Sequence, residues 1–205
     1  MPKQPMIVGN PVLIVVDIQK SAFMRGYDNG IPRMPNYYEN LERARSMVDA
    51  AHEADIPVIF FQEIHRKDLI DYGRELDGDE DIHCLEGRPG TPVAAEEMDM
   101  RDTDYFIHKR RYSCFFGTEL EILLKGLKAE TLILVGGLTD VCVHYTFVDG
   151  HQSDYFCRVA KDCLGGSSQA AHDASLNAME YLQTGAVLPS ADLIAGMLER
   201  KKDAA

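Results

Sequence analysis

The sequence predicts an α/β protein in which a central, mainly parallel sheet lies between two layers of helices. Two observations predict this fold. Short apolar runs, typical of strands buried on both faces, alternate with segments of helical spacing. No internal repeat or low-complexity tract interrupts the alternation, and a length of 205 residues fits one domain over residues 1–205. Because strands and helices alternate, we expect parallel strands with helices on both faces.

The first two strands are predicted in the N-terminal third. Residues 12–16 (VLIVV) form a continuous apolar run that ends at Asp17. Residues 19–35 are rich in Gly, Pro and Asn, which predicts a loop. Residues 36–54 predict a helix, because one stripe at helical spacing holds Tyr37, Leu41, Ala44, Val48 and Ala51. Residues 56–61 (IPVIFF) predict the second strand.

The middle of the chain contains its least regular part. Residues 62–104 are rich in acidic residues, glycine and histidine and have little periodicity. Such a long irregular stretch in a compact domain is usually functional. Residues 105–108 predict a short third strand that leads to Lys109, and residues 118–127 predict a helix with leucines on one face. Residues 131–135 predict the fourth strand.

The C-terminal third continues the alternation. Residues 140–152 predict a helix, residues 155–160 a strand and residues 168–184 another helix. Residues 186–202 predict a short strand and a last helix that Ser190 would cap.

Composition and charge indicate a globular protein that does not bind polyanions. A formal net charge of -12 is unfavourable for nucleic acid or an anionic membrane as partner. The one basic cluster, residues 109–111, is too short to follow a phosphate backbone. No apolar run approaches the roughly 20 residues that span a bilayer. The N-terminal residues 1–10 lack the apolar segment of a signal peptide, so we expect a cytoplasmic protein.

The cysteines are expected to be reduced thiols. Their odd number and the absence of CxxC spacing indicate neither a disulfide framework nor a zinc-finger module. A redox-sensing thiol is a further alternative, but no resolving cysteine lies two or three residues from Cys142. The five residues are Cys84, Cys114, Cys142, Cys157 and Cys163.

Three reactive residues follow three of the predicted strands. Asp17 closes the first strand, Lys109 closes the third, and Cys142 follows the fourth after Gly136 and Gly137. We expect all three at the carboxyl edge of the sheet, where ligands bind in such folds. Each also has an ordinary alternative: a capping aspartate, a solvated lysine and a buried small apolar cysteine. Their coincidence at one edge favours a nucleophilic site.

The chemistry of these three groups fits attack on a carbonyl carbon. The N-terminus of the predicted helix and the charge of Lys109 would favour the thiolate of Cys142. Asp17 would accept the thiol proton, and Lys109 would hold Asp17 ionised. Asp17 would then protonate the departing ammonia or amine, and water would hydrolyse the thioester. Backbone N–H groups at the turn and at the helix start would form an oxyanion hole.

Four motifs, in order, resemble the isochorismatase-like superfamily of cysteine hydrolases. They are VLIVVDIQKSAF (12–23), HCLEGRPG (83–90), KRRYSCFFGTEL (109–120) and GGLTDVCV (136–143), and a Gly-Ala pair follows at 185–186. The superfamily includes nicotinamidases, N-carbamoylsarcosine amidases, ureidoacrylate amidohydrolases and the isochorismatases proper. The resemblance covers nearly the whole chain, and it implies the three-layer α/β/α fold with a mainly parallel sheet.

The resemblance implies the catalytic set Asp17, Lys109 and Cys142. It also implies a cis peptide bond between Gly137 and Leu138, with the N–H groups of Leu138 and Cys142 directed at the oxyanion. A cysteine at the nucleophile position makes vinyl-ether hydrolysis less favoured. We therefore expect cleavage of an amide or ureido C–N bond.

The substrate-binding residues are harder to derive. The resemblance places Gln19 and Phe23 in the pocket, and His65 followed by Arg66 is similar to metal-free members. A substrate carboxylate or ureido group would be held by Glu63, Arg66 or Arg74, and the planar fork of arginine suits a carboxylate. Tyr112, Phe115 and Phe116 could form an apolar wall of the pocket, a part of the core or a subunit interface. Tyr112 is included among the expected substrate contacts.

A metal site is the main open alternative. Nicotinamidases of the superfamily bind a divalent metal through an Asp-x-His pair and a later histidine. The equivalent positions here are Glu63, His65 and His83, and the extra methylene of glutamate moves its carboxylate. We expect no cofactor, with one divalent ion (zinc, manganese or iron) as the alternative.

The leading prediction is a cytoplasmic cysteine amidohydrolase that cleaves a C–N bond of a small amide or N-carbamoyl (ureido) compound. The alternatives are a metal-dependent nicotinamidase and a non-catalytic assembly protein of the same fold. The expected partner is a small-molecule substrate, without nucleic acid or membrane. The resemblance also implies a homo-oligomer, either a dimer or a tetramer.

Overall fold

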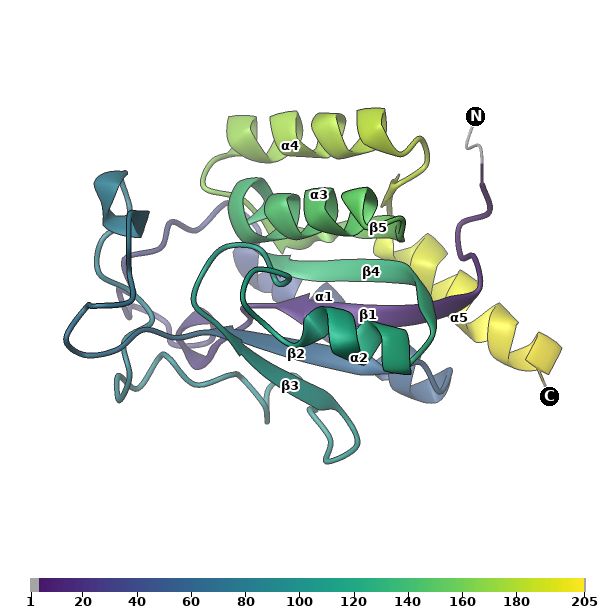
Figure 1. The fold of residues 1–205 in the computed structure, drawn as a ribbon, viewed down its shortest axis with the longest axis horizontal. Helices are drawn as coiled ribbons and strands as arrows, with labels where there is room; N and C mark the ends of the chain where they lie inside the picture. Colours follow the sequence, from purple (N-terminus) through teal and green to yellow (C-terminus); the bar gives the residue numbers. More distant parts are fainter. Residues whose placement is uncertain (1–3, 205) are drawn as a thin grey trace.

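A computed structural model describes residues 4–204 and shows a parallel six-stranded sheet (Figure 1). The strand order is β3-β2-β1-β4-β5-β6, and every pair of neighbouring strands is parallel. The strands are β1 (Asn10–Val16), β2 (Val58–Glu63), β3 (Tyr105–Lys109), β4 (Ala129–Gly137), β5 (Phe156–Gly165) and β6 (Val187–Leu188).

Helices cover both faces of the sheet and complete three layers. One face packs against α1 (Tyr37–Glu53) and α5 (Ser190–Ala204), and the other against α2 (Leu120–Gly126), α3 (His144–Gln152) and α4 (Gln169–Leu182). Figure 1 shows α2 in front of the sheet and α1 behind it. Alternate side chains of each central strand enter the two cores, which explains the continuous apolar runs. The predicted fold class is confirmed.

Several boundaries differ from the predicted ones. Strand β2 starts two residues later than predicted and reaches Glu63, while β5 continues to Gly165. The helix predicted from residue 140 begins instead with a π-helical turn over Thr139–Val143. In that turn the Val143 N–H donates to Leu138 O at 3.1 Å, five residues back. The apolar pattern cannot distinguish this spacing from an α-helical one.

The capping prediction for the last helix is also corrected. Ser190 is the first residue of α5 and does not act alone as its cap. Asp162 of β5 accepts a hydrogen bond from the Ser190 N–H at 2.7 Å and another from its hydroxyl at 2.7 Å. A carboxylate on a neighbouring strand thus binds the helix N-terminus, a contact between residues distant in sequence.

The order of the strands brings a third charged residue into the site. Asp17 and Lys109 do not follow neighbouring strands, because β2 lies between β1 and β3. Glu63, the last residue of β2, is in register with Lys109 on β3. A third charged side chain therefore lies between the two predicted ones.

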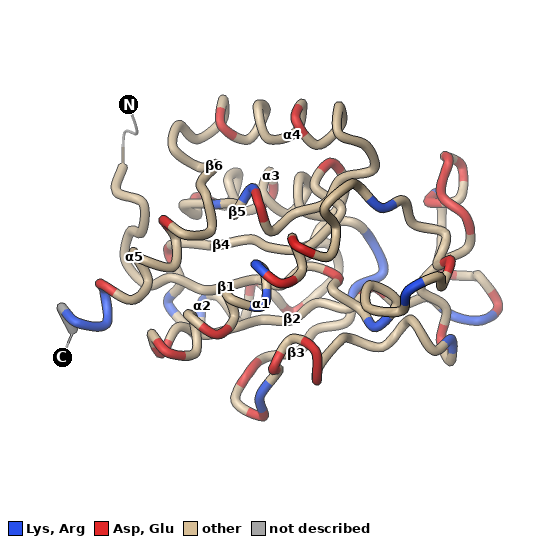
Figure 2. Tube along the Cα trace, turned by 180° about the vertical axis from the view of Figure 1, so that it is seen from behind, with Lys and Arg blue, Asp and Glu red and all other residues tan. Residues whose placement is uncertain are grey.

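The segment between β2 and β3 crosses the carboxyl ends of the strands (Figure 1). It contains the short 3₁₀ helix η2 (Glu75–Asp77), and an isolated bridge pairs His65 with Leu85. Figure 2 shows acidic and basic positions interspersed along the loops at this end of the molecule. Within residues 4–204, none of the helices has the length and apolar character needed to span a bilayer.

Candidate active site

The ammonium group of Lys109 is the centre of the site. Its Nζ lies 2.7 Å from Asp17 Oδ2 and 2.8 Å from Glu63 Oε2, and it donates to Cys142 Sγ at 3.3 Å. The same Nζ also donates a hydrogen bond to the Arg111 carbonyl at 3.0 Å, which helps to hold the ammonium group in place. Lys109 is only 1% exposed, although it follows a strand in a basic run. The ordinary alternative of a solvated lysine is therefore wrong, because the side chain points inward to two carboxylates and a thiol.

The thiol is positioned by the end of β4. The peptide bond between Gly137 and Leu138 is cis, and Cys142 lies in the π-helical turn that follows. Gly136 has a φ of 114°, and a Cβ there would lie 2.0 Å from Val16 O. Only glycine fits this position, since any side chain would collide with the neighbouring strand. The close approach of β4 to β1 brings Cys142 to the end of the strand that carries Asp17.

The two carboxylates beside Lys109 differ in their acidity. Burial raises the pKa of Asp17 to about 6, against the opposing charge of Lys109. Burial acts on Glu63 in the same direction, but Lys109 and hydrogen bonds from His65 and His83 outweigh it, and the pKa of Glu63 lies well below its ordinary value. Neighbouring groups whose pKa values are pushed apart are typical of acid and base roles. Glu63 is therefore a permanent anion, whereas Asp17 exchanges a proton near neutrality.

The protonation state of Cys142 differs from the one expected from the sequence. Burial raises the pKa of its thiol well above the ordinary value, and the charge of Lys109 opposes this only in part. Glu63 Oε2 lies 3.7 Å from the Sγ atom, close enough for its negative charge to disfavour a thiolate. The resting group is a thiol, which needs a base at the moment of attack. Asp17, Glu63 and Cys142 present atoms within 4.8 Å of one another.

A cavity of about 90 Å³ opens onto these groups. Asp17, Cys142 and Leu138 line it, and among the expected substrate contacts so do Gln19 and Tyr112. Gln19 is held in place because its amide nitrogen donates to the carbonyls of Glu63 and Thr91. A space of this size holds roughly six to nine water molecules, so its ligand is small.

Other predicted substrate contacts lie elsewhere. Phe23 packs on the core beneath α1 and α5, and His65 is fully buried behind Glu63. Arg66 and Arg74 point to solvent and pair with Asp68 and Asp77, with side chains 59% and 91% exposed. None of these four lines the cavity. The expected role of both arginines is corrected, because the segment after β2 turns their side chains away from the sheet.

The two aromatic residues proposed for an apolar wall also lie outside the cavity. Phe115 packs against the core that contains α2 and α3, and Phe116 is 65% exposed. Their neighbour Tyr112 alone reaches the cavity. Burial raises the pKa of Tyr112 to about 12, so its hydroxyl stays protonated and can donate a hydrogen bond.

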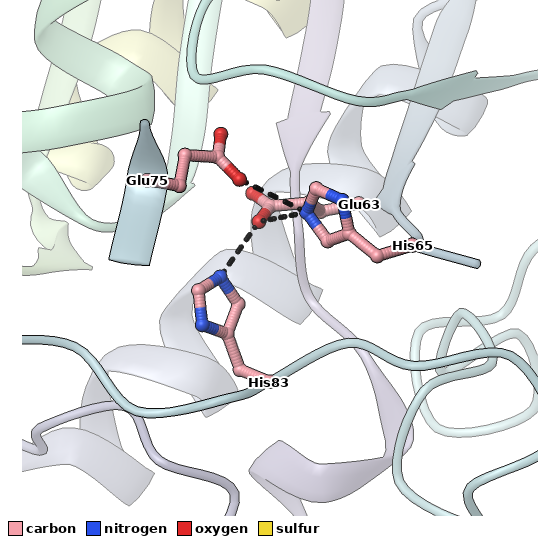
Figure 3. A group of neighbouring side chains, drawn as sticks. All are labelled: Glu63, His65, Glu75 and His83. Atoms are coloured by element: carbon pink, nitrogen blue, oxygen red, sulfur yellow. Dashed lines mark hydrogen bonds and ion pairs between the residues drawn. The ribbon is translucent and has the colours of Figure 1, made fainter. Parts of the chain in front are cut away.

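Behind Glu63 lies a buried cluster of two glutamates and two histidines (Figure 3). Glu63 Oε1 lies 3.2 Å from His65 Nε2 and 2.9 Å from His83 Nε2. His65 Nε2 is also 3.1 Å from Glu75 Oε2. The His65 N–H donates to the Cys84 carbonyl at 2.8 Å, and His65 forms an isolated bridge with Leu85. These backbone contacts bring His83 beside the end of β2.

The donor atoms of this cluster fit a divalent cation. Both histidines direct Nε2 toward Glu63, and His83 Nδ1 lies 2.7 Å from the Asp81 carbonyl, which fixes the tautomer that ligates through Nε2. Glu75 is buried, and its Oε1 has no hydrogen-bond partner within residues 4–204. All four donor atoms lie within 4.8 Å of one another. Glu63, His65, Glu75 and His83 form a nitrogen and oxygen set that suits zinc, manganese or iron.

Three residues of the site were not assigned these roles from the sequence. The sequence predicts Glu63 only as a metal or substrate ligand, because the predicted strand 56–61 ends two residues before it, whereas β2 reaches Glu63 in the structure. Glu75 lies in η2 and Arg33 in the loop after β1, and Arg33 lines the cavity. Neither position carries a pattern that distinguishes it from other polar loop residues.

Comparisons with known proteins identify the family of the chain. The family model described as Isochorismatase domain matches residues 11–192. The chain is 31% identical over 191 residues to the ureidoacrylate amidohydrolase RutB of Serratia proteamaculans (strain 568), a match that covers 82% of this chain and 75% of that protein. A shorter match, 33% identical over 79 residues, is to the uncharacterized isochorismatase family protein YaaI of Bacillus subtilis (strain 168). It covers 38% of this chain and 44% of that protein.

Solved structures show the same architecture. A cysteine hydrolase from Pseudomonas syringae pv. phaseolicola 1448A superposes with a TM-score of 0.78 at 25% identity. The alignment covers 100% of this chain and 97% of that chain. The chain therefore belongs to the isochorismatase family, and it is a hydrolase of that family.

Proposed function

We propose that this hydrolase is a cysteine amidohydrolase that cleaves the C–N bond of a small amide or ureido compound. One observation carries the proposal: Lys109 joins Asp17, Glu63 and Cys142 at the end of a small cavity. The similarity to a ureidoacrylate amidohydrolase supports this choice of bond. Burying a lysine between two carboxylates is costly unless the geometry is well satisfied, and the adjacent thiol and cavity favour a catalytic role for this arrangement.

Asp17 begins the reaction as the base. Its carboxylate takes the proton of Cys142 as the sulfur attacks the carbonyl carbon of the substrate, so that the new S–C bond forms while the S–H bond breaks. Lys109 stays charged, because the negative charges of Asp17 and Glu63 outweigh the effect of burial and raise its pKa. The N–H groups of Leu138 and Cys142 would donate to the oxygen that becomes negative. Leu138 N–H donates to no backbone acceptor within residues 4–204, which supports that role.

Asp17 then acts as the acid. It gives the proton to the departing nitrogen as the C–N bond breaks, which leaves a thioester on Cys142 and an ionised Asp17. A water molecule that is deprotonated by Asp17 hydrolyses the thioester and restores the thiol. Throughout both steps Glu63 balances the charge of Lys109, so Asp17 can exchange its proton without leaving the lysine unpaired.

A panel of substrates tests the proposed activity. We expect purified protein to release ammonia from at least one member of a set of primary amides, alkyl ureas and N-carbamoyl amino acids. The release is measured with a coupled assay. Absence of turnover on every amide and ureido compound, with folded protein shown by circular dichroism, would contradict the proposal.

The pH profile provides a second test. Because Asp17 must be ionised to accept the thiol proton, kcat/KM is expected to fall as the pH drops through about 6, the pKa that burial gives this carboxyl. The fall should be about tenfold for each pH unit below that value. An acid limb near the ordinary aspartate value of 3.8 would contradict the raised pKa of Asp17, and an acid limb that persists in Asp17→Asn with residual activity would show that Asp17 is not the base. Glu63 cannot cause a limb near 6, because its pKa is lowered.

A metal-dependent amidase of the nicotinamidase type is the second candidate, and the cluster in Figure 3 favours it. Glu63, His65, Glu75 and His83 would hold the ion, which would supply a Lewis-acidic position for a lone pair of the substrate. Without a cation, a proton occupies the cluster: burial lowers the pKa of His65, but the contacts of its ring N–H with the accepting carboxylates of Glu63 and Glu75 outweigh this and raise the pKa to about 9. Glu63 and Glu75 therefore stabilise a positive charge between them, whether it is a metal ion or the protonated ring of His65.

Metal content distinguishes the two candidates. For the metal-dependent one, we expect about one equivalent of zinc, manganese or iron to remain after dialysis, measured by elemental analysis. Glu75→Gln is expected to weaken binding by about tenfold or more, because a neutral amide replaces a carboxylate ligand. His52→Gln is a matched control, since His52 pairs with Asp104 far from the cluster. Metal-free wild-type protein with full activity would reject this candidate.

The expected homo-oligomer and the cytoplasmic location stay predictions. Large apolar side chains are exposed on α2 and α4, with Ile122 at 77% and Tyr181 at 87%, and these surfaces support an association of copies.

A further inference from the structure

A guanidinium group lines the cavity without an acidic partner. Arg33, in the loop between β1 and α1, lies in the same cavity wall as Asp17 and Cys142. The chain has 33 acidic residues against 21 basic ones, so carboxylates are abundant. Within residues 4–204 the contacts of Arg33 are nevertheless two carbonyl oxygens and one aromatic ring. A guanidinium group that lines a cavity and pairs with no carboxylate is available to bind an anionic ligand.

The contacts of Arg33 hold one side of the guanidinium and leave the other free. Its Nη2 donates to Ser21 O at 2.7 Å and to Tyr27 O at 3.2 Å. Its Cζ lies 5.6 Å from the centre of the Tyr37 ring, a cation–π contact that orients the plane. Neither Nε nor Nη1 has a hydrogen-bond acceptor in the described chain, and neither is a buried atom without a partner. The free N–H groups of Nη1 can therefore donate charge-assisted hydrogen bonds to a carboxylate.

The other amide groups of this wall are already used. Asn40 donates to Leu164 O at 2.6 Å and accepts from Arg43 at 2.5 Å. Asn29 donates to the Ser21 hydroxyl at 3.0 Å. Three carboxylates also line the cavity, but Asp17 and Glu63 pair with Lys109, and Glu80 Oε2 lies 3.9 Å from His83 Nε2. Arg33 is therefore the group of this wall with charge and donors left for a ligand.

We propose that Arg33 binds a carboxylate of the substrate and thereby selects small anionic amides, such as N-carbamoyl amino acids, over neutral ones. The carbonyl carbon would lie at Cys142 and the carboxylate at Arg33, two groups that line one small cavity. The inference rests on the proposed amidohydrolase function, because it assigns the substrate class of that site. It replaces Arg66 and Arg74, which point to solvent, by a residue inside the cavity.

Kinetics with two matched probes test this assignment. The anionic probe is N-carbamoylglycine, and the neutral probe is its carboxamide. For Arg33→Met we expect kcat/KM to fall by about 10- to 100-fold with the acid, mainly through KM, and to change little with the neutral probe. Arg33→Lys should recover part of the loss, because it keeps the charge without the planar fork.

Arg25→Met is the matched control. Arg25 lies on the same loop and stacks on Tyr38 at 4.7 Å, but it is exposed and outside the cavity. We expect no change with either probe. Equal losses for acid and neutral probe in Arg33→Met would overturn the assignment, since they would show a structural role. A higher kcat/KM of the wild-type protein with the neutral probe than with the acid would also overturn the assignment.

Binding without turnover separates this inference from the proposed function. N-carbamoylglycine is titrated calorimetrically into Cys142→Ser and into Cys142→Ser with Arg33→Met. Binding that depends on Arg33, in a wild-type protein that hydrolyses no amide, would support the carboxylate site and contradict the amidohydrolase. Hydrolysis of neutral amides by a protein that does not bind N-carbamoylglycine would support the amidohydrolase and contradict the carboxylate site.

Discussion

Replacement of Lys109 by methionine is expected to abolish amide hydrolysis and to lower the free energy of unfolding by about 3–5 kcal/mol. Methionine keeps much of the length and volume of the side chain but removes its charge. Asp17 and Glu63 would then be buried together without their shared cation, and Cys142 would lose its hydrogen bond. Urea unfolding at pH 7 measures the stability, and ammonia release measures the activity. An unchanged unfolding midpoint would contradict the central role of Lys109.

Two further variants separate charge from packing. Lys125→Met removes a lysine from an exposed pair with Glu121, with side chains 69% and 59% exposed. This control is expected to cost no more than about 0.5 kcal/mol. Combining Lys109→Met with Glu63→Gln removes one of the stranded carboxylates, so the double variant should lose less stability than the sum of the single ones. It should still be inactive, because Asp17 and Cys142 lack the lysine.

The second large effect is expected for Cys142→Ser. We expect kcat/KM to fall by at least about 10³-fold. The reason is the strength of the base: a carboxyl with a pKa of about 6 has little ability to remove the proton of an alcohol. Substrate binding should persist, because the cavity and its other wall residues are unchanged. Initial rates of ammonia release over a range of substrate concentrations give kcat/KM and measure the loss.

Cys157→Ser is the matched control for this change. Cys157 is also fully buried, but it lies on β5 away from the cavity, and its Sγ is 3.8 Å from the Tyr155 carbonyl. A serine hydroxyl there can donate to the same oxygen, so we expect activity near that of the wild type. If Cys142→Ser kept more than about a tenth of the activity, the sulfur would not be the nucleophile.

Much of the fold could be predicted because it depends on local patterns. The run VLIVV at 12–16 is apolar throughout, since strand β1 is buried on both faces, and this pattern is typical of a parallel sheet between helices. The helix over 36–54 shows a stripe because one face contacts the core. Boundaries were less accurate. The start of the helix after β4 depends on a π-helical turn that apolar spacing does not encode.

The sequence by itself determined which reactive side chains follow the strands. Asp17, Lys109 and Cys142 were identified because parallel strands end at one edge, whatever their order. The glycines before Cys142 were recognised as a tight turn, and Gly136 is indeed a place where no side chain fits. These inferences need only chain direction and local sterics.

Tertiary structure alone decided how these groups act together. Strand order placed Glu63 beside Lys109, and burial, which no residue pattern reports, raised the pKa values of Asp17 and Cys142. The path of two irregular loops put Arg33 into the cavity and turned Arg66 out of it. Such contacts join residues far apart in sequence, and their energies depend on solvent exclusion, which only the folded chain creates.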